Sequence, residues 1–202
     1  QGSSCMKVAA SDNIVVFRAS EVAFLRAEGA LRGWNMGGSP KDLYEAGIRL
    51  SFEENNISSG VESYLANTGK VEGYKDPLKG QSGQTYDYSG SINTAVTVAW
   101  AGGDFEKSLE QIITQKWIAN FPNGMESWSE YRRTGYPKLM PMAANASSGI
   151  VDDTEGARRM PYPTDEYREN KESVEAAVLT LTQESKTKKG DSMATHVWWD
   201  CK

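Results

Sequence analysis

Two helix-like segments joined by a short glycine-rich turn constrain the fold of this chain more than any other feature. Apolar residues in segment 21–32 have the i, i+3, i+4 and i+7 spacings of a helix face, and Tyr44, Ile48 and Phe52 form an i, i+4, i+8 stripe in segment 40–55. Residues 14–56 are therefore predicted to contain a helical hairpin, whose residues 22–55 have about the length of one tetratricopeptide unit. A single hairpin cannot bury its apolar faces alone, so further helices must pack against it.

Residues with helix-capping chemistry mark the ends of both segments. Ser20 precedes the first segment as a predicted N-cap, and Gly33 follows its end. Ser39 is the predicted N-cap of the second segment, with Pro40 at the first helical position. Because the chain must reverse between two packed helices, at least one turn glycine is expected to have a positive φ. The candidates are Gly33, Gly37 and Gly38.

Two further segments are predicted to be helical, at residues 104–120 and 170–182, and residues 125–133 are predicted to form a short helix or a turn. Asp104 and Asn170 are placed to cap the first and the last of them. One side of the first helix is apolar and is predicted to enter the core, with the residues Leu109, Ile112, Ile113 and Trp117.

The order of these elements favours a mainly α fold with few short strands. Residues 95–100 form one strand-like piece within the segment 66–104. No alternation of strands and helices supports a parallel sheet. The predicted architecture is a tetratricopeptide-like helical hairpin packed with loop-rich segments.

Residues 66–104 are rich in glycine and small polar residues and are predicted to form a long loop. Their aromatic side chains do not follow the spacing of a helix face. An aromatic ring can stack on a sugar, and neighbouring polar side chains can bind the sugar hydroxyl groups. The predicted ligand-binding residues are Tyr74, Tyr86, Tyr88 and Trp100.

Composition and charge exclude several classes of protein. The 202 residues carry a net charge of −5, whereas nucleic-acid binding requires a basic face. One histidine and two cysteines are too few for an ordinary Cys/His metal site. No carboxylate pair, nucleophile–histidine pattern or phosphate loop stands out. The sequence predicts no enzyme, no catalytic residue, no metal ligand, no cofactor and no nucleic-acid partner.

The neighbouring arginines Arg132 and Arg133 allow two interpretations. Their guanidinium groups could hold a sugar or an anion through paired hydrogen bonds. Alternatively, they could lock a turn by pairing with Glu126 or Glu130. We favour the structural role, which predicts that at least one arginine is mostly buried and paired within the chain.

Three longer sequence strings carry a resemblance to a known family. The first is EVAFLRAEGALRGWNMGG at residues 21–38. The second combines ITQKWIA at residues 113–119 with NGMESWSEYRRTGYP at residues 123–137. The third is RRMPYP at residues 158–163, followed by Glu166, Tyr167 and Asn170. In this order, the strings resemble conserved segments of the SusD/RagB family.

The resemblance implies a fold and a function. Members of the family are α-helical, with tetratricopeptide-like pairs that support a loop-rich ligand face. They are lipid-anchored on the outer face of the outer membrane in Bacteroidetes. They bind oligosaccharides or other nutrients without catalysis and cap a TonB-dependent transporter of the SusC type. These properties are the expectations that the resemblance sets for this chain.

The resemblance also implies how the chain is organised. The matching strings form the C-terminal part of full-length members, so residues 1–202 are expected to be the C-terminal part of a single SusD-like domain. Its parts would be the hairpin at 14–56, the long loop at 66–104, and helices and closing loops at 104–202. The lipid anchor would lie outside this chain. The expected partners are the SusC-type transporter, an oligosaccharide and the upstream N-terminal part of the same protein.

Two other functions remain open on the residues alone. A helical-repeat scaffold for protein–protein interaction would bury the loop aromatic residues and present an apolar groove elsewhere. A carbohydrate-active enzyme would need paired carboxylates in a pocket. The hairpin also has apolar residues on more than one side: Phe24, Leu31 and Leu43 are expected on a different face from Val22, Ala30 and Ile48. One side is therefore predicted to be an exposed apolar patch that upstream helices cover.

Overall fold

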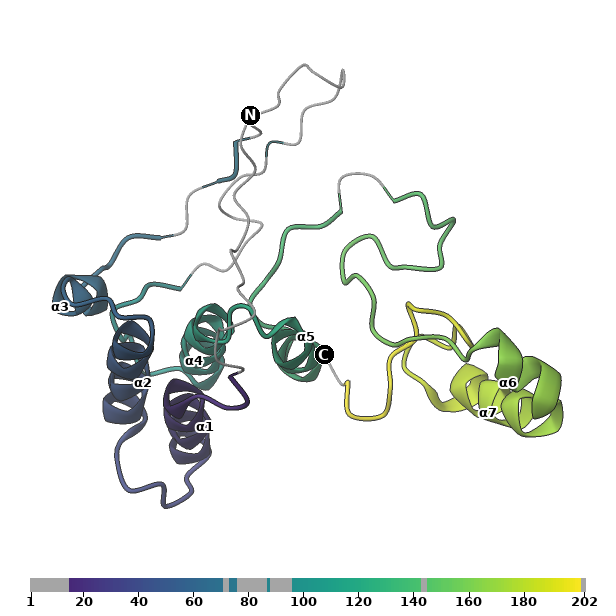
Figure 1. Cartoon of the computed structure of the whole chain (residues 1–202), viewed down its shortest axis with the longest axis horizontal. Helices are drawn as coiled ribbons and strands as arrows, with labels where there is room; N and C mark the ends of the chain where they lie inside the picture. The colour runs from purple at the N-terminus through teal and green to yellow at the C-terminus, as the bar shows by residue number, and fades with distance from the viewer. Residues whose placement is uncertain (1–14, 71–72, 76–86, 88–95, 143–144, 201–202) are drawn as a thin grey trace.

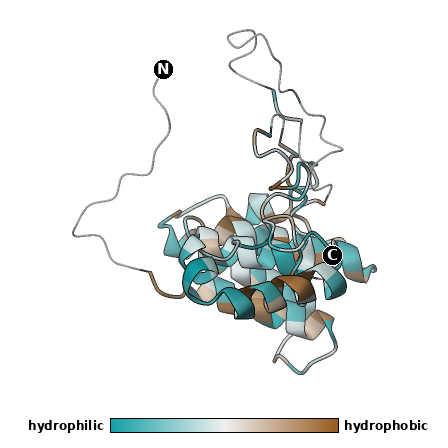
Figure 2. Cartoon of the chain, turned by 90° about the vertical axis from the view of Figure 1, so that its right-hand side faces the viewer, coloured by the Kyte–Doolittle hydropathy of each residue, from teal (hydrophilic) through white to brown (hydrophobic). Residues whose placement is uncertain are grey.

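The computed structural model of the chain consists of seven helices within the residues it describes (Figure 1). The described residues are 15–70, 73–75, 87, 96–142 and 145–200. The helices are α1 (Ala19–Leu31), α2 (Pro40–Glu54), α3 (Val61–Leu65), α4 (Phe105–Ala119), α5 (Gly124–Thr134), α6 (Thr164–Glu169) and α7 (Lys171–Glu184). Brown and teal alternate along them in the hydropathy view, as expected of amphipathic helices (Figure 2).

Helices α1 and α2 form the predicted hairpin and pack side by side. Gly33 and Gly37 have positive φ values of 85° and 74°, which confirms the predicted use of glycine in the turn. A third glycine, Gly47 of α2, allows the two helices to approach closely. A Cβ atom at Gly47 would lie 2.8 Å from the ring of Phe24 in α1. The hairpin therefore depends on a glycine that the sequence pattern did not single out.

Of the four predicted N-caps, two are confirmed by a side-chain hydrogen bond and one is wrong. The fourth, Asn170, occupies the N-cap position of α7 without a side-chain cap bond. Ser39 accepts a hydrogen bond from the Asp42 amide, and Asp104 accepts one from the Lys107 amide. Ser20, in contrast, lies inside α1, which begins one residue earlier. Its hydroxyl donates a 2.6 Å hydrogen bond to Glu54, at the end of α2. A partner on the neighbouring helix therefore holds the side chain that was expected to cap α1.

Helix α4 packs across both members of the hairpin and completes the core. The buried cluster is Phe24, Ala27, Leu43, Tyr44, Ile48, Leu109, Ile112, Ile113 and Ala119. The expectation that Phe24 and Leu43 face away from Ile48 is wrong, because all three enter this one cluster. The reason is that α1 and α2 both pack against α4, so side chains from both helices meet in the same core.

Trp117 was expected in the core, but it is 38% exposed. The inner position of that helical turn is occupied by Lys116, which is 1% exposed. Its ammonium lies 3.5 Å from Glu21, 3.3 Å from Glu126 and 3.2 Å from Glu130. Three carboxylates from α1 and α5 compensate the burial of this lysine. Lys116 therefore takes the inner side of the helix, and the next residue, Trp117, lies at the surface.

The predicted structural role of the arginine pair is confirmed. Arg132 is 8% exposed and donates a 2.8 Å hydrogen bond to the carbonyl of Arg158, and its guanidinium lies 3.5 Å from the centre of the Trp128 ring. Arg133 pairs with Glu130, as expected, and also with Glu28 of α1. These contacts attach α5 to α1 and to the segment that follows α5.

The C-terminal part is tied down by a second buried cluster. Arg158 forms an ion pair with Asp200, and both side chains are almost fully buried. His196 lies between Glu155, at 2.7 Å, and the carbonyl of Asp200, at 3.2 Å. Helices α6 and α7 contact each other and none of the other described helices (Figure 1).

Short strands were expected, but none occurs in the ranges given above. Residues 96–100 of the strand-like piece are irregular, and residue 95 lies outside the described residues. Asp152 and Gly156 form an isolated β-bridge. The Gln111 side chain donates hydrogen bonds to the backbone carbonyls of Thr97 and Ala99, which a neighbouring strand would bind in a sheet. No described helix combines the length and the apolar character needed to cross a membrane.

Candidate functional site

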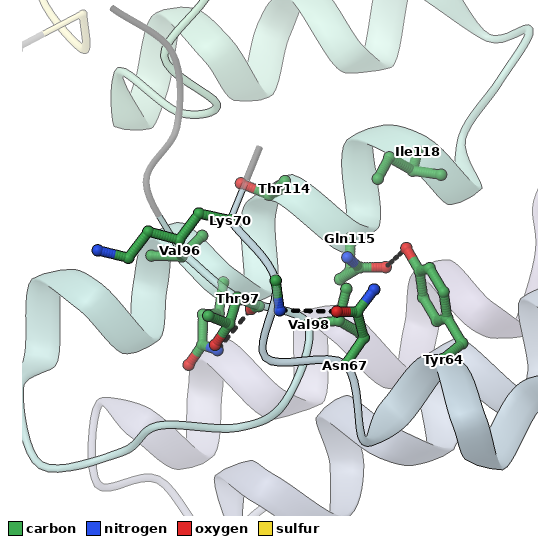
Figure 3. Close-up of a pocket in the computed structure, with 11 residues that line it drawn as sticks. Tyr64, Asn67, Lys70, Val96, Thr97, Val98, Thr114, Gln115 and Ile118 are labelled. Carbon is green, nitrogen blue, oxygen red and sulfur yellow. Dashed lines mark hydrogen bonds between the residues drawn. The ribbon is translucent and has the colours of Figure 1, made fainter. Parts of the chain in front are cut away.

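A pocket of about 410 Å³ lies between α3, the turn that follows it, residues 96–98 and α4 (Figure 3). Its lining includes Lys70 and Val96, two residues of the long loop predicted at 66–104. These two residues of the loop therefore lie at the pocket wall. The remaining polar lining comes from Tyr64, Asn67, Thr97, Gln111, Thr114 and Gln115.

Gln115 of α4 is hydrogen-bonded to Tyr64 of α3. The Tyr64 hydroxyl donates a 3.0 Å hydrogen bond to the Gln115 side-chain oxygen. The Gln115 nitrogen lies on the side of the amide away from Tyr64 (Figure 3). This nitrogen has no hydrogen-bond partner among the described residues. The Gln115 amide therefore offers a donor to the pocket.

Asn67 is oriented by the backbone. Its side-chain oxygen accepts a 2.7 Å hydrogen bond from the Gly69 amide. Because a backbone N–H can only donate, this bond fixes which end of the Asn67 amide is the oxygen. The Asn67 nitrogen is left as a second donor at the pocket wall, without a partner among the residues described.

Gln111 has a different role, because both ends of its amide are used within the chain. Its nitrogen donates to the carbonyls of Thr97, at 2.8 Å, and Ala99, at 2.9 Å. Its oxygen accepts a 3.2 Å hydrogen bond from the Ala101 amide. Gln111 therefore holds the irregular segment 97–101 against α4 and builds one wall of the pocket.

The pocket combines fixed polar groups with apolar surface. Val96, Val98 and Ile118 contribute the apolar part of the lining. Sugars present hydroxyl groups at their edges and C–H groups on their faces, so they need both kinds of contact. Among the described residues of the lining, there is no carboxylate. The described lining can bind and orient a polar ligand.

The structure places the predicted ligand-binding residues in different settings. Tyr74 is 41% exposed. Trp100 packs on the core, where its ring centre lies 5.1 Å from that of Tyr44. Neither of them lines the pocket. Tyr86 and Tyr88 lie outside the described residues.

The pocket residues were missed because the sequence analysis followed aromatic residues in the loop. One signal was available. Gln111 and Gln115 are four residues apart on α4, next to the apolar Ile112. Polar residues at that spacing share a helix face, and two amides beside a buried stripe indicate a polar site or a structural network.

No group of three or more metal-ligating side chains occurs in the described part of the chain. The lone histidine, His196, is 1% exposed and lies beside Glu155. It belongs to the C-terminal cluster described above and does not line the amide pocket.

The fold and the pocket define a class: helical proteins built on tetratricopeptide-like pairs, with a polar binding pocket beside a helix. Within that class, the family model for "Susd and RagB outer membrane lipoprotein" matches residues 1–200. The chain belongs to the SusD/RagB family, as the sequence strings indicated. No curated protein matches the chain.

Solved structures of SusD homologues are similar to the chain. One from Bacteroides ovatus is 88% identical with a TM-score of 0.89 and covers 99% of this chain and 40% of its own. One from Bacteroides thetaiotaomicron is 49% identical with a TM-score of 0.84 and covers 97% and 40%. A chitin-binding SusD homologue from Flavobacterium johnsoniae is 46% identical with a TM-score of 0.76 and covers 90% and 36%. The chain thus spans about two fifths of the length of these relatives.

Proposed function

We propose that this chain forms part of a non-catalytic glycan-binding protein and that the amide pocket contacts the glycan. The observation that carries the proposal is the side-chain nitrogen of Gln115, which has no hydrogen-bond partner among the described residues and belongs to a side chain that lines the pocket. A sugar hydroxyl or carbonyl oxygen in the pocket could accept a hydrogen bond from it. Asn67 supplies a second donor on the same pocket.

The aromatic residues of the long loop are proposed to complete the contact. They are Tyr74, Tyr86, Tyr88 and Trp100. Lys70 and Val96 of the loop lie at the pocket wall. Rings from this loop can stack on sugar units beyond the one held by Gln115.

Family membership supports the proposed ligand class and location. The family description names an outer membrane lipoprotein, and one relative at 46% identity is a chitin-binding protein. We place this protein on the outer surface, lipid-anchored through sequence outside this chain. Bound oligosaccharide would pass to a TonB-dependent transporter of the SusC type.

The remainder of the longer protein is proposed to dock on α1, so that residues 1–202 form the C-terminal part of a single domain. Val22 and Leu25 of α1 are 38% and 42% exposed, and Trp34 after its end is 63% exposed. Leu25 and Trp34 border one hollow of about 520 Å³ between α1 and α5. An apolar surface of this kind favours a partner, and the upstream N-terminal part is the partner that the family organisation suggests.

The glycan proposal is tested with a glycan array probed with the chain, alone and with its upstream part. Binding is expected for oligosaccharides of at least one class. Gln115→Ala is expected to weaken binding by about tenfold, the effect of one lost hydrogen bond. Gln183→Ala removes an exposed glutamine at the end of α7 and serves as the matched control. Equal binding by both variants would contradict a role for the pocket, and absence of any glycan binding would favour the protein-interaction scaffold.

A further inference from the structure

The amide pocket has one ionised side chain among its described lining residues, and that side chain is Lys70. The rest of the lining is neutral, and no carboxylate of the described lining balances the ammonium. We infer that the pocket selects acidic glycans, in which a sugar carboxylate pairs with Lys70. This inference rests on the proposed function and names the ligand class of the same site.

Lys70 is available for such a pair. Its side chain is exposed, and it forms no ion pair with any carboxylate in the part of the chain that the structure describes. The neighbouring lysine Lys75 differs, because its ammonium lies 4.0 Å from Asp87. The chain as a whole carries a net charge of −5, whereas Lys70 has no carboxylate partner among the described residues. A local positive charge favours an anionic ligand group.

The positions of Lys70 and Gln115 separate two kinds of contact. Figure 3 shows Lys70 reaching away from the pair formed by Tyr64 and Gln115. The pocket therefore has an amide end, where a neutral sugar oxygen can accept a hydrogen bond, and a cationic end at Lys70. A ligand that spans both ends needs an acceptor at one end and a negative charge at the other.

The donors at the amide end do not favour an acetamido sugar over an acidic one. An acetamido group has an N–H that needs an acceptor. The side-chain oxygens of Gln115, Asn67 and Gln111 each already accept one hydrogen bond within the chain. A carboxylate brings only acceptor oxygens, which match the side-chain N–H donors of Gln115 and Asn67.

The test uses matched pairs of ligands that differ in charge alone. Oligomers of galacturonate, glucuronate and mannuronate are compared with their methyl esters, and a chito-oligosaccharide is the acetamido reference. At least one acidic oligomer is expected to bind about threefold to tenfold more tightly than its ester, as for one partly exposed ion pair. The preference is expected to shrink as the salt concentration rises.

Two variants separate this inference from the proposed function. Lys70→Gln is expected to abolish the preference for the acid over its methyl ester. Gln115→Ala is expected to weaken both ligands alike and to preserve the preference. Lys171→Gln, at an exposed lysine of α7, is the charge-matched control and should change neither.

Three results would overturn the inference. One is an ester or a chito-oligosaccharide that binds as tightly as every acidic oligomer. Another is a preference for the acid that survives in Lys70→Gln. Either result leaves glycan binding intact and removes only the acidic specificity. The third is the absence of binding to any glycan, which overturns the proposed function together with the inference.

Discussion

Arg133 and Glu28 lie 105 positions apart in the sequence, and their side chains form a two-pronged ion pair with N–O distances of 2.7 and 2.6 Å. The Glu28 side chain is 8% exposed. Arg32 donates to the same carboxylate from one turn further along α1. Helix α5 is thus attached to α1 through the Glu28 carboxylate. Burial alone would raise the Glu28 pKa, but the four hydrogen bonds from Arg133 and Arg32 lower it.

Replacing Arg133 by methionine is expected to lower the free energy of unfolding by about 2–3 kcal/mol, because Glu28 would keep a buried charge with one partner fewer. Urea denaturation followed by circular dichroism measures the change. Arg168→Met is the control, since Arg168 is 70% exposed and pairs only at the surface. Equal stability of the two variants would contradict a structural role for the Arg133–Glu28 pair.

Gly47→Ala is expected to destabilise the chain by about 1–3 kcal/mol, because the new methyl group would meet the Phe24 ring at 2.8 Å. Gly124→Ala is the matched control, since a Cβ atom there has no neighbour within 4 Å. Thermal unfolding of both variants compares the two positions. A Gly47→Ala variant as stable as the control would show that the α1–α2 interface can relax without cost.

The stability of the segment after α5 is expected to depend on pH through Asp152. Backbone amides of Glu155 and Thr154, together with the Thr154 hydroxyl, lower the pKa of Asp152 from 3.8 to about 2. A lowered pKa means that the native state releases the proton more readily than the unfolded state. The contribution is therefore complete above about pH 4 and is lost as the pH falls toward 2.

Asp152→Asn tests this dependence. The variant is expected to be about 1–2 kcal/mol less stable than the natural chain at pH 7 and equally stable near pH 2. Urea denaturation at pH 7, 4 and 2.5 gives the comparison. A stability difference that stays constant over this range would rule out the carboxylate charge as its source.

The loop aromatic residues are expected to separate into two groups on mutation. Tyr74→Ala should weaken glycan binding without a change in stability, because Tyr74 is 41% exposed. Trp100→Ala should lower stability by about 3 kcal/mol, because its ring packs against Tyr44 in the core. Thermal unfolding combined with glycan titration distinguishes the two. If both variants bind glycan as tightly as the unchanged chain, these residues do not belong to the proposed site.

Much of the fold could be predicted from local sequence signals. Ser39, Pro40 and Asp104 mark helix starts through their own side-chain and backbone chemistry, and the structure has helices there. The short helix α3 was missed, because five residues give too little periodicity to identify a helix. Helix α6 was missed for the same reason, since its six residues include no buried side chain.

Much less of the candidate site could be predicted. Aromatic residues in a loop are visible in the sequence, and so is the spacing of Gln111 and Gln115. The hydrogen bond between Gln115 and Tyr64, 51 positions away, is what leaves the Gln115 nitrogen to the pocket. A hydrogen bond between distant elements leaves no periodic pattern, so the spacing could indicate a polar helix face but not this contact.

The sequence by itself determined the helical class, the hairpin with its glycine turn, and the membership of the SusD/RagB family. These follow from contacts between near neighbours along the chain and from strings of adjacent residues. Tertiary structure alone decided that Lys116 is buried while Trp117 is exposed. The physical reason is that a side chain's burial depends on the charges that other helices bring to it, and Glu21 and Glu130 reach Lys116 only after α1, α4 and α5 have packed.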